Sequence, residues 1–167
     1  LKSFDDRSYR QLGGVLANVL ETIRRLQQME FWIEIVTLLV PGFNDGDDEL
    51  RRMADFLAEV SAHIPWHLTP FHPDYKMVDP PQTPAETLLR ACAVGRQAGL
   101  RYTYAGNVPG RVGDQESTRC PGCGMILIRR EGFVVLDNQL QAGLCPGCQA
   151  QIPGVWEAAA PRRSNSG

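Results

Sequence analysis

Long apolar runs are missing from this sequence. No segment reaches the roughly 18 consecutive apolar residues that a membrane-spanning helix requires, so no membrane span is predicted. The chain begins Leu1-Lys2-Ser3-Phe4, without methionine, without a charged leader region and without a small-residue cleavage site, so no signal peptide is visible. We therefore expect a truncated chain that works in the cytoplasm and does not interact with membranes.

An excess of charge of either sign is also missing. Seventeen Lys and Arg residues face 19 Asp and Glu residues, which gives a net charge of -2 and a pI near 5.9. That balance provides no field to attract nucleic acid or an anionic membrane, so a nucleic-acid partner is not expected. Hydrophobic residues make up 43% of the 167 residues, enough for one ordinary domain or a compact domain plus a small one.

Cysteine is scarce, and its placement is informative. Four of the five cysteines form two CPGC pairs, and Cys92 stands alone in a predicted helix, where we expect a buried, inert thiol. An odd count without a signal peptide favours a metal in a reducing compartment over disulfides. The residues between the pairs predict a strand over 125–128, a turn, and a strand over 133–136. Such a hairpin would bring the pairs together, so the sequence predicts a closed, structural zinc-ribbon or rubredoxin-like site whose ligands to Zn²⁺ or iron are Cys120, Cys123, Cys145 and Cys148.

The part of the chain before the ribbon alternates between helix and strand patterns. The sequence predicts helix from Tyr9 to Leu26, a strand covered on both faces over 31–40, helix over 50–60, strand over 65–71, a proline-rich loop over 72–82, helix from the capping box at 83–86 to Ala98, and strand over 100–104. This alternation predicts an α/β fold with a parallel sheet. Three strands and a stub at Lys2 would form either a small open sheet or part of a barrel, because a closed eight-stranded barrel takes roughly 250 residues.

Polar or loop-forming residues follow each predicted strand. In parallel α/β folds, chemistry collects at the carboxyl ends of the strands. Those ends carry Lys2, Leu38 to Gly42, His72 and Asn107. Each also has an ordinary explanation: a solvated lysine, a strand stop, a histidine packed beneath a loop, a turn asparagine. His67 is predicted to point to the opposite side of its strand, or to be core.

Several longer segments are similar to a known family. LKSF, LLVPGFNDGDDEL, PWHLTPFHPDYKM and GLRYTYAGNVPG, followed by the CPGCG ribbon and IPGVW, resemble the carboxyl half of radical S-adenosylmethionine (SAM) enzymes of the pyruvate formate-lyase-activating-enzyme type. Within that group the sequence resembles the radical SAM enzyme of the AmmeMemoRadiSam system. The resemblance extends to Trp156 and implies a partial (β/α) radical SAM-type barrel followed by a small four-cysteine zinc-ribbon β-hairpin module. The corresponding divisions are 1–110 for the barrel half, 111–117 for a polar linker, 118–156 for the ribbon and 157–167 for a disordered tail.

The resemblance also implies a chemistry and a set of contacts. Such enzymes use a [4Fe-4S] cluster to cleave SAM reductively into a 5′-deoxyadenosyl radical, which abstracts hydrogen from a substrate that is often a partner protein. Lys2 matches a lysine near the SAM carboxylate, although the acidic residue that accompanies it in the family is absent. Leu38 matches an apolar contact to the adenine or ribose, and His72 a histidine near SAM, while the substrate side would include Tyr75, Lys76 and Asn107. The sequence contains no CxxxCxxC cluster motif, so we expect a carboxyl-terminal fragment that has no catalytic residue of its own and whose substrate is open.

Two other hypotheses remain. The ribbon could hold a protein or nucleic-acid partner on an α/β scaffold, but three ribbon arginines (119, 129 and 130) face three acidic residues (116, 131 and 137), which leaves no electrostatic footprint. A small standalone enzyme could use His72 as a general base, but no nucleophile or acidic orienting group stands at motif spacing.

Overall fold

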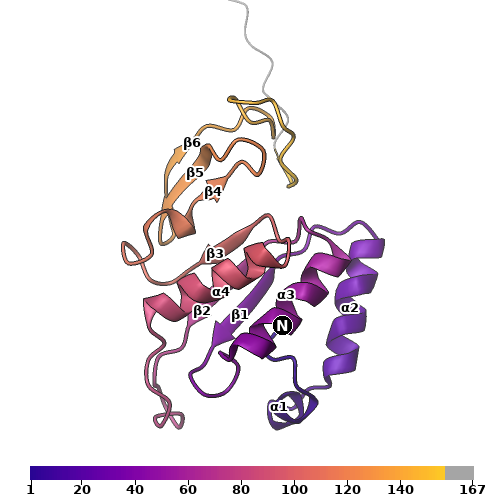
Figure 1. The fold of residues 1–167 in the computed structure, drawn as a ribbon, viewed down its shortest axis with the longest axis vertical. Helices are drawn as coiled ribbons and strands as arrows, with labels where there is room; N and C mark the ends of the chain where they lie inside the picture. Colours follow the sequence, from indigo (N-terminus) through magenta and orange to yellow (C-terminus); the bar gives the residue numbers. More distant parts are fainter. Residues whose placement is uncertain (157–167) are drawn as a thin grey trace, which may run out of the picture.

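Three short parallel strands form the sheet of the first part of the chain, in a computed structural model that describes residues 1–156 (Figure 1). The strands are β1 (Ile35–Leu39), β2 (Trp66–Pro70) and β3 (Thr103–Ala105), in the order β1-β2-β3. Helices α3 (Asp47–Val60) and α4 (Ala85–Gln97) connect them, as the alternation predicted. The sheet is open among the described residues, and the predicted tail over 157–167 lies outside them.

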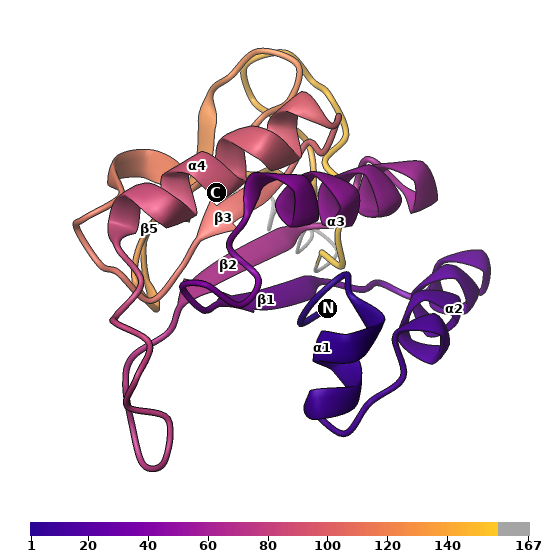
Figure 2. The same ribbon diagram turned by 60° about the horizontal axis from the view of Figure 1, so that its bottom comes forward.

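Among the described residues, helices cover one face of the sheet and leave the other open. Figure 2 shows α3 and α4 on the same side of the strands, and the main core lies there, around Leu39, Trp66 and Leu68. Alternate residues of β1 are exposed, with Val36 at 54% and Leu38 at 44% of their possible surface. The prediction that β1 is covered on both faces was therefore wrong. An apolar run cannot by itself distinguish a strand buried on both faces from one with an apolar open face.

The first helical stretch is two helices rather than one. Helix α1 (Asp6–Gln11) is capped by Asp5, whose Oδ1 accepts a hydrogen bond from the Ser8 backbone N–H at 2.8 Å. The chain then turns through Gly13, which has a φ of 74°, a conformation that glycine adopts without a steric penalty. Helix α2 (Leu16–Gln28) follows and buries Leu16 and Ile23. The apolar spacing was read correctly, but the break at the glycines was missed.

The start of α4 also differs from the prediction. Pro84 is its N-cap residue, and no side chain caps the helix. Thr83 instead turns back to the sheet, where its hydroxyl donates to the Leu39 carbonyl at 2.6 Å and accepts from the Phe71 N–H at 3.0 Å. The predicted capping box was therefore wrong, because the Thr83 hydroxyl bonds to Leu39 of β1 and to Phe71, which follows β2, and does not cap the helix. The other end agrees with the prediction, since Gly99, with a φ of 104°, follows the helix.

A second, antiparallel sheet follows the first. It consists of β4 (Thr118–Arg119), β5 (Ile126–Glu131) and β6 (Val134–Asn138) in the order β4-β5-β6, and Figure 1 shows it beyond β3. The predicted hairpin is thus present. Tyr102, just before β3, is buried in the small core of this sheet with Leu127 and Ile152.

The segment over 111–117 connects the two sheets. It contains the short 3-10 helix η1 (Gly113–Glu116), and its Val112 belongs to the main core. Gln115 accepts a hydrogen bond from Arg96 of α4 at 2.9 Å. Contacts from this segment therefore reach the α/β part of the chain. In the described part of the chain, no helix is both long enough and apolar enough to cross a bilayer.

Candidate functional site

The two CPGC segments fold into matching tight turns. In the first, the Cys120 N–H donates to the Met125 carbonyl and the Gly124 N–H donates to the Cys120 carbonyl, both at 2.8 Å. In the second, the Cys145 N–H and the Gln149 N–H make the equivalent bonds at 2.9 and 2.8 Å. Gly124 and Gln149, which follow the second cysteine of each pair, both have positive φ, at 77° and 61°. The shared backbone path places both sulfurs of each pair on one side of its turn.

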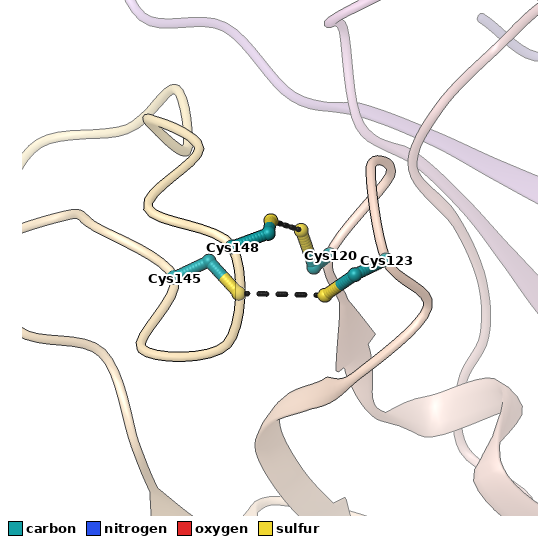
Figure 3. Close-up of side chains that lie close together, drawn as sticks. All are labelled: Cys120, Cys123, Cys145 and Cys148. Atoms are coloured by element: carbon teal, nitrogen blue, oxygen red, sulfur yellow. Dashed lines mark hydrogen bonds between the residues drawn. The ribbon is translucent and has the colours of Figure 1, made fainter.

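The four cysteine sulfurs meet between the two turns (Figure 3). All lie within 4.8 Å of one another, and the Sγ–Sγ distances are 3.5 Å for Cys120–Cys148 and 3.6 Å for Cys123–Cys145. Zn–S bonds of about 2.3 Å in a tetrahedron place sulfurs about 3.8 Å apart, so this cluster could hold a single ion. None of the five cysteines forms a disulfide.

The surroundings of the sulfurs favour the thiolate form of Cys120 and disfavour the thiolate form of Cys148. Burial alone would raise the pKa of Cys120, but hydrogen bonds from the backbone N–H groups of Cys123 and Gly122 outweigh it, and the pKa falls to about 7. The backbone N–H of Ala150 acts to lower the pKa of Cys148, yet the neighbouring Cys120 and Cys123 sulfurs raise it to about 12. Four clustered sulfurs cannot all ionise without a cation, which is what a bound metal supplies.

Cys92 has no part in this cluster. It is fully buried in α4, and burial raises the pKa of its thiol to about 11. A protonated, enclosed thiol is neither nucleophile nor metal ligand. The location agrees with the prediction of a buried, inert thiol.

The predicted strand-end residues gather at one end of the first sheet. Asn44 joins two of them, because its Nδ2 donates to the backbone carbonyls of Lys2 at 2.7 Å and Leu38 at 2.8 Å. The Phe71 N–H donates to the Leu39 carbonyl at 3.1 Å, which brings the start of the next loop, with His72, to the same end. Lys2, Leu38 and His72 all have exposed side chains.

Asn44 is a residue that the sequence reading missed. It is 1% exposed, and its Oδ1 also accepts from the Val40 N–H at 2.8 Å. One side chain thus satisfies three backbone groups where the amino-terminal segment meets β1. An asparagine in an acidic, turn-rich loop gives no sequence signal of that role, because turn asparagines are common.

The residues proposed for the substrate side do not gather in one place. Tyr75 is 83% exposed at the tip of a turn closed by backbone hydrogen bonds between Asp74 and Met77, and Lys76 lies beside its ring. Asn107 lies after β3 and lines a large cavity between the open face of the sheet and the ribbon, which Tyr75 and Lys76 do not line. Tyr75 and Asn107 both have positive φ, at 51° and 59°.

His67 lies on the open face of the first sheet, beside Glu34 and Tyr104. The register pairs Val36 with His67 and Leu38 with Thr69, so His67 shares the face of Leu38, and the prediction that it points to the opposite side was wrong. Its Nε2 lies 2.7 Å from Glu34 Oε2, and its ring stacks on Tyr104 at 4.8 Å. The period of two along β2 could have placed His67 on the same face as Thr69, but relating that face to Leu38 requires the register between strands.

The ribbon arginines are largely engaged by Asp114 of the connecting segment and by Thr118 of β4. Asp114 pairs with both Arg119 at 2.8 Å and Arg129 at 3.2 Å, and Arg130 donates to the Thr118 hydroxyl at 2.7 Å. These contacts leave little free positive charge for a phosphate backbone. They speak against the nucleic-acid hypothesis.

Comparison with known proteins adds sequence and fold relationships. The chain is 39% identical over 142 residues to an uncharacterized protein, MJ0808, of Methanocaldococcus jannaschii, a match that covers 83% of this chain and 42% of that protein. It is 31% identical over 75 residues to the isethionate sulfite-lyase activating enzyme of Oleidesulfovibrio alaskensis, covering 43% of this chain and 24% of that enzyme. The chain therefore spans less than half the length of these curated relatives. No protein-family model matches it.

A solved structure shares the fold. The crystal structure of a domain of pyruvate-formate lyase-activating enzyme from Bacteroides vulgatus superimposes with a TM-score of 0.57 and 23% sequence identity, over 64% of each chain. At this identity the likeness concerns the fold alone. The comparisons show a partial similarity to activating enzymes, and the structure itself shows a mixed α/β fold with a four-cysteine group.

Proposed function

We propose that this chain is the carboxyl-terminal part of a radical SAM enzyme of the activating-enzyme type, and more narrowly of the AmmeMemoRadiSam kind. The observation that carries the proposal is the sequence similarity to an activating enzyme, joined to the gathering of Lys2, Leu38 and His72 at one end of a parallel sheet. A cationic amine suits a carboxylate, and an exposed leucine suits a purine or ribose face. These residues would bind and orient SAM, and the cofactor would supply hydrogen-abstraction chemistry.

The radical iron-sulfur cluster does not fit the residues of this chain. The four grouped cysteines come from two separate CPGC turns of the ribbon, and the fifth cysteine is enclosed in α4. No other group of three or more metal-ligating side chains is present among the described residues. We therefore place the ligands of the radical cluster outside this chain and derive no step through it. We assign no single substrate to the proposed enzyme, and a partner protein is one candidate.

The four-cysteine group is proposed as a separate, structural metal site for Zn²⁺ or iron. A closed set of four sulfurs leaves no coordination position for a substrate. We propose a division in which 1–110 forms the barrel half, 118–156 the ribbon, and 111–117 the connection. The metal site would then act as a clasp that holds the ribbon together beside the sheet.

The test uses a protein that contains this chain together with the sequence encoded upstream of it. We expect that upstream sequence to carry a CxxxCxxC motif, and the purified, reduced protein to form 5′-deoxyadenosine from SAM. Leu38→Ser should raise the KM for SAM by about tenfold, because part of a leucine contact of about 1.5–3 kcal/mol is lost. Leu136→Ser, at a comparably exposed leucine on β6, is the matched control and should leave the KM unchanged.

Two results would contradict the proposal. One is an upstream sequence with no such motif. The other is a KM for SAM that does not change in the Leu38 variant while the protein still cleaves SAM. An unchanged KM would mean that Leu38 does not contact SAM even though the protein cleaves it.

A further inference from the structure

A pocket of about 280 Å³ lies between helix α4, strand β3 and the start of the ribbon. Arg96 of α4, Thr103 of β3, Gln115 of η1 and Arg119 of β4 line it, together with Arg101 from the segment between α4 and β3. Its size is near the lower end of small-molecule sites, roughly 300 Å³. No Asp or Glu is among the lining residues, so the pocket has three arginines and no acid in its wall.

The guanidinium group of Arg96 is held in place by neutral partners. Its Nη1 donates to the Thr103 hydroxyl at 3.2 Å and to Gln115 Oε1 at 2.9 Å. Gln115 is fixed in turn, because its Nε2 donates to the Thr103 carbonyl at 3.3 Å. No ion pair of the described residues includes Arg96. Since a guanidinium group has five N–H donors, Arg96 presents a positioned positive charge with donors left over.

The other two arginines of the pocket differ in how far they are neutralised. Arg101 is exposed, and in the described part of the chain its side chain forms no ion pair. Arg119 pairs with Asp114 at 2.8 Å, but the same carboxylate also pairs with Arg129 at 3.2 Å. Asp114 does not line the pocket. Arg96 and Arg101 therefore contribute two positive charges that no acid of the described residues offsets.

Two such charges favour a dianion over a monoanion. A phosphate monoester carries about −1.5 to −2 charges at pH 7 and offers three strong acceptor oxygens, whereas a carboxylate carries a single charge. Guanidinium groups bind phosphate oxygens through short, charge-assisted hydrogen bonds. The volume of the pocket suits one phosphate group on a small molecule.

We propose that this pocket binds a dianionic phosphate group, either free phosphate or the monoester of a small molecule, through Arg96 and Arg101. Arg119 borders the group from the ribbon side, so the ligand contacts both the first sheet and the ribbon. None of Lys2, Leu38 and His72 lines the pocket. The proposal therefore holds or fails independently of the proposed SAM site.

Inorganic phosphate and glycerol 1-phosphate are the probes, and dimethyl phosphate, which has a tetrahedral phosphate with one negative charge, is the ligand control. Binding to the purified, metal-loaded protein is measured by titration calorimetry and phosphorus NMR at pH 8 and fixed ionic strength. We expect at least one of the two dianions to bind about tenfold more tightly than dimethyl phosphate. Tighter binding of the monoester assigns the site to a phosphorylated small molecule, and tighter binding of inorganic phosphate assigns it to the free anion.

Arg101→Gln should weaken binding of the preferred probe by about tenfold, because it removes one of the two unpaired charges. Arg51→Gln is the matched control, because it removes the same charge from an exposed position of α3 outside the pocket and should leave binding unchanged. Adding Arg96→Gln to Arg101→Gln should abolish measurable binding. If circular dichroism shows that this double variant does not fold, the single Arg101 variant decides.

Three results would overturn the proposal. The first is that neither dianion binds at millimolar concentration. The second is that dimethyl phosphate binds as tightly as both dianions, which would mean that the second charge is not recognised. The third is that the Arg101 and Arg51 variants bind the preferred probe equally well, which would place the phosphate outside this pocket.

Discussion

At the scale of single residues, Asn44 matters most for the strand-end geometry. Its side chain bonds the Val40 N–H and the carbonyls of Lys2 and Leu38. Asn44→Ala removes all three bonds and leaves buried backbone groups unpaired, so we expect a loss of about 2–4 kcal/mol in unfolding free energy. Chemical denaturation measures it. Asn18→Ala, at an exposed position of α2, is the control and should change stability little.

Gly95 allows α4 to approach the sheet closely. A Cβ at this position would lie 2.8 Å from Thr103 Cγ2 and 3.0 Å from Trp66 Cε3, and Trp66 is fully buried. We expect Gly95→Ala to destabilise the protein by about 1–3 kcal/mol despite the better helix propensity of alanine. Gly46→Ala is the matched control, because nothing lies within 4 Å of its added Cβ. Equal unfolding midpoints for the two variants would refute the close packing of α4.

The Cys92 thiol should resist modification in the folded protein. Burial raises its pKa to about 11 from an ordinary value of 9.0, so thiolate is scarce at pH 8. We expect peptide mapping after iodoacetamide treatment of the metal-loaded protein to show modification of Cys92 only after unfolding.

The same raised pKa affects stability at alkaline pH. The unfolded thiol ionises near pH 9 and the folded one near 11. The stabilising effect of the neutral buried thiol is therefore complete below pH 9 and is lost as the pH rises toward 11. Cys92→Ala should flatten that part of the stability profile. An equally steep decline in the variant would assign the decline to other groups.

At the scale of elements, periodicity identified most helices and strands but not their boundaries or faces. The apolar spacing in 50–60 predicted α3, and the pattern between the cysteine pairs predicted the hairpin of β5 and β6. The break between α1 and α2 was missed because Gly13 interrupts a continuous apolar face. The capping box failed because Thr83 bonds to the sheet. Local patterns do not reveal which partner a hydroxyl selects in the folded chain.

The ribbon should depend on its metal while the first sheet should not. Its core is small and is built around Tyr102, Leu127 and Ile152, and two of its four cysteines, Cys123 and Cys148, are exposed residues. We expect chelation to abolish the hydrogen-exchange protection of β4, β5 and β6, because metal binding contributes directly to the folding of such modules. Backbone amides of β1 and β2 should stay protected. Retained protection of β5 and β6 in the metal-free protein would contradict a structural role for the metal.

At the scale of the whole molecule, the sequence located the components of the site more readily than their arrangement. The CPGC spacing alone predicted the four-cysteine group, because ligand spacing is a local property. The cavity between sheet and ribbon could not be predicted, since its lining residues come from segments that are far apart in the sequence. The Tyr104 and Thr118 hydroxyls lie 3.0 Å apart across this junction. Glu116 likewise appears in the sequence as one more acidic residue near an arginine-rich hairpin. Its burial becomes visible only once the ribbon is placed beside the sheet.

The central claim is that Cys120, Cys123, Cys145 and Cys148 form a structural single-ion site, separate from any radical cluster. Elemental analysis of the purified 167-residue chain, combined with an assay for acid-labile sulfide, tests it most directly. We predict one zinc or one iron per chain, no sulfide, and loss of that metal in Cys145→Ser but not in Cys92→Ser. Several irons per chain with matching acid-labile sulfide would contradict this assignment, because those four cysteines would then hold an iron-sulfur cluster.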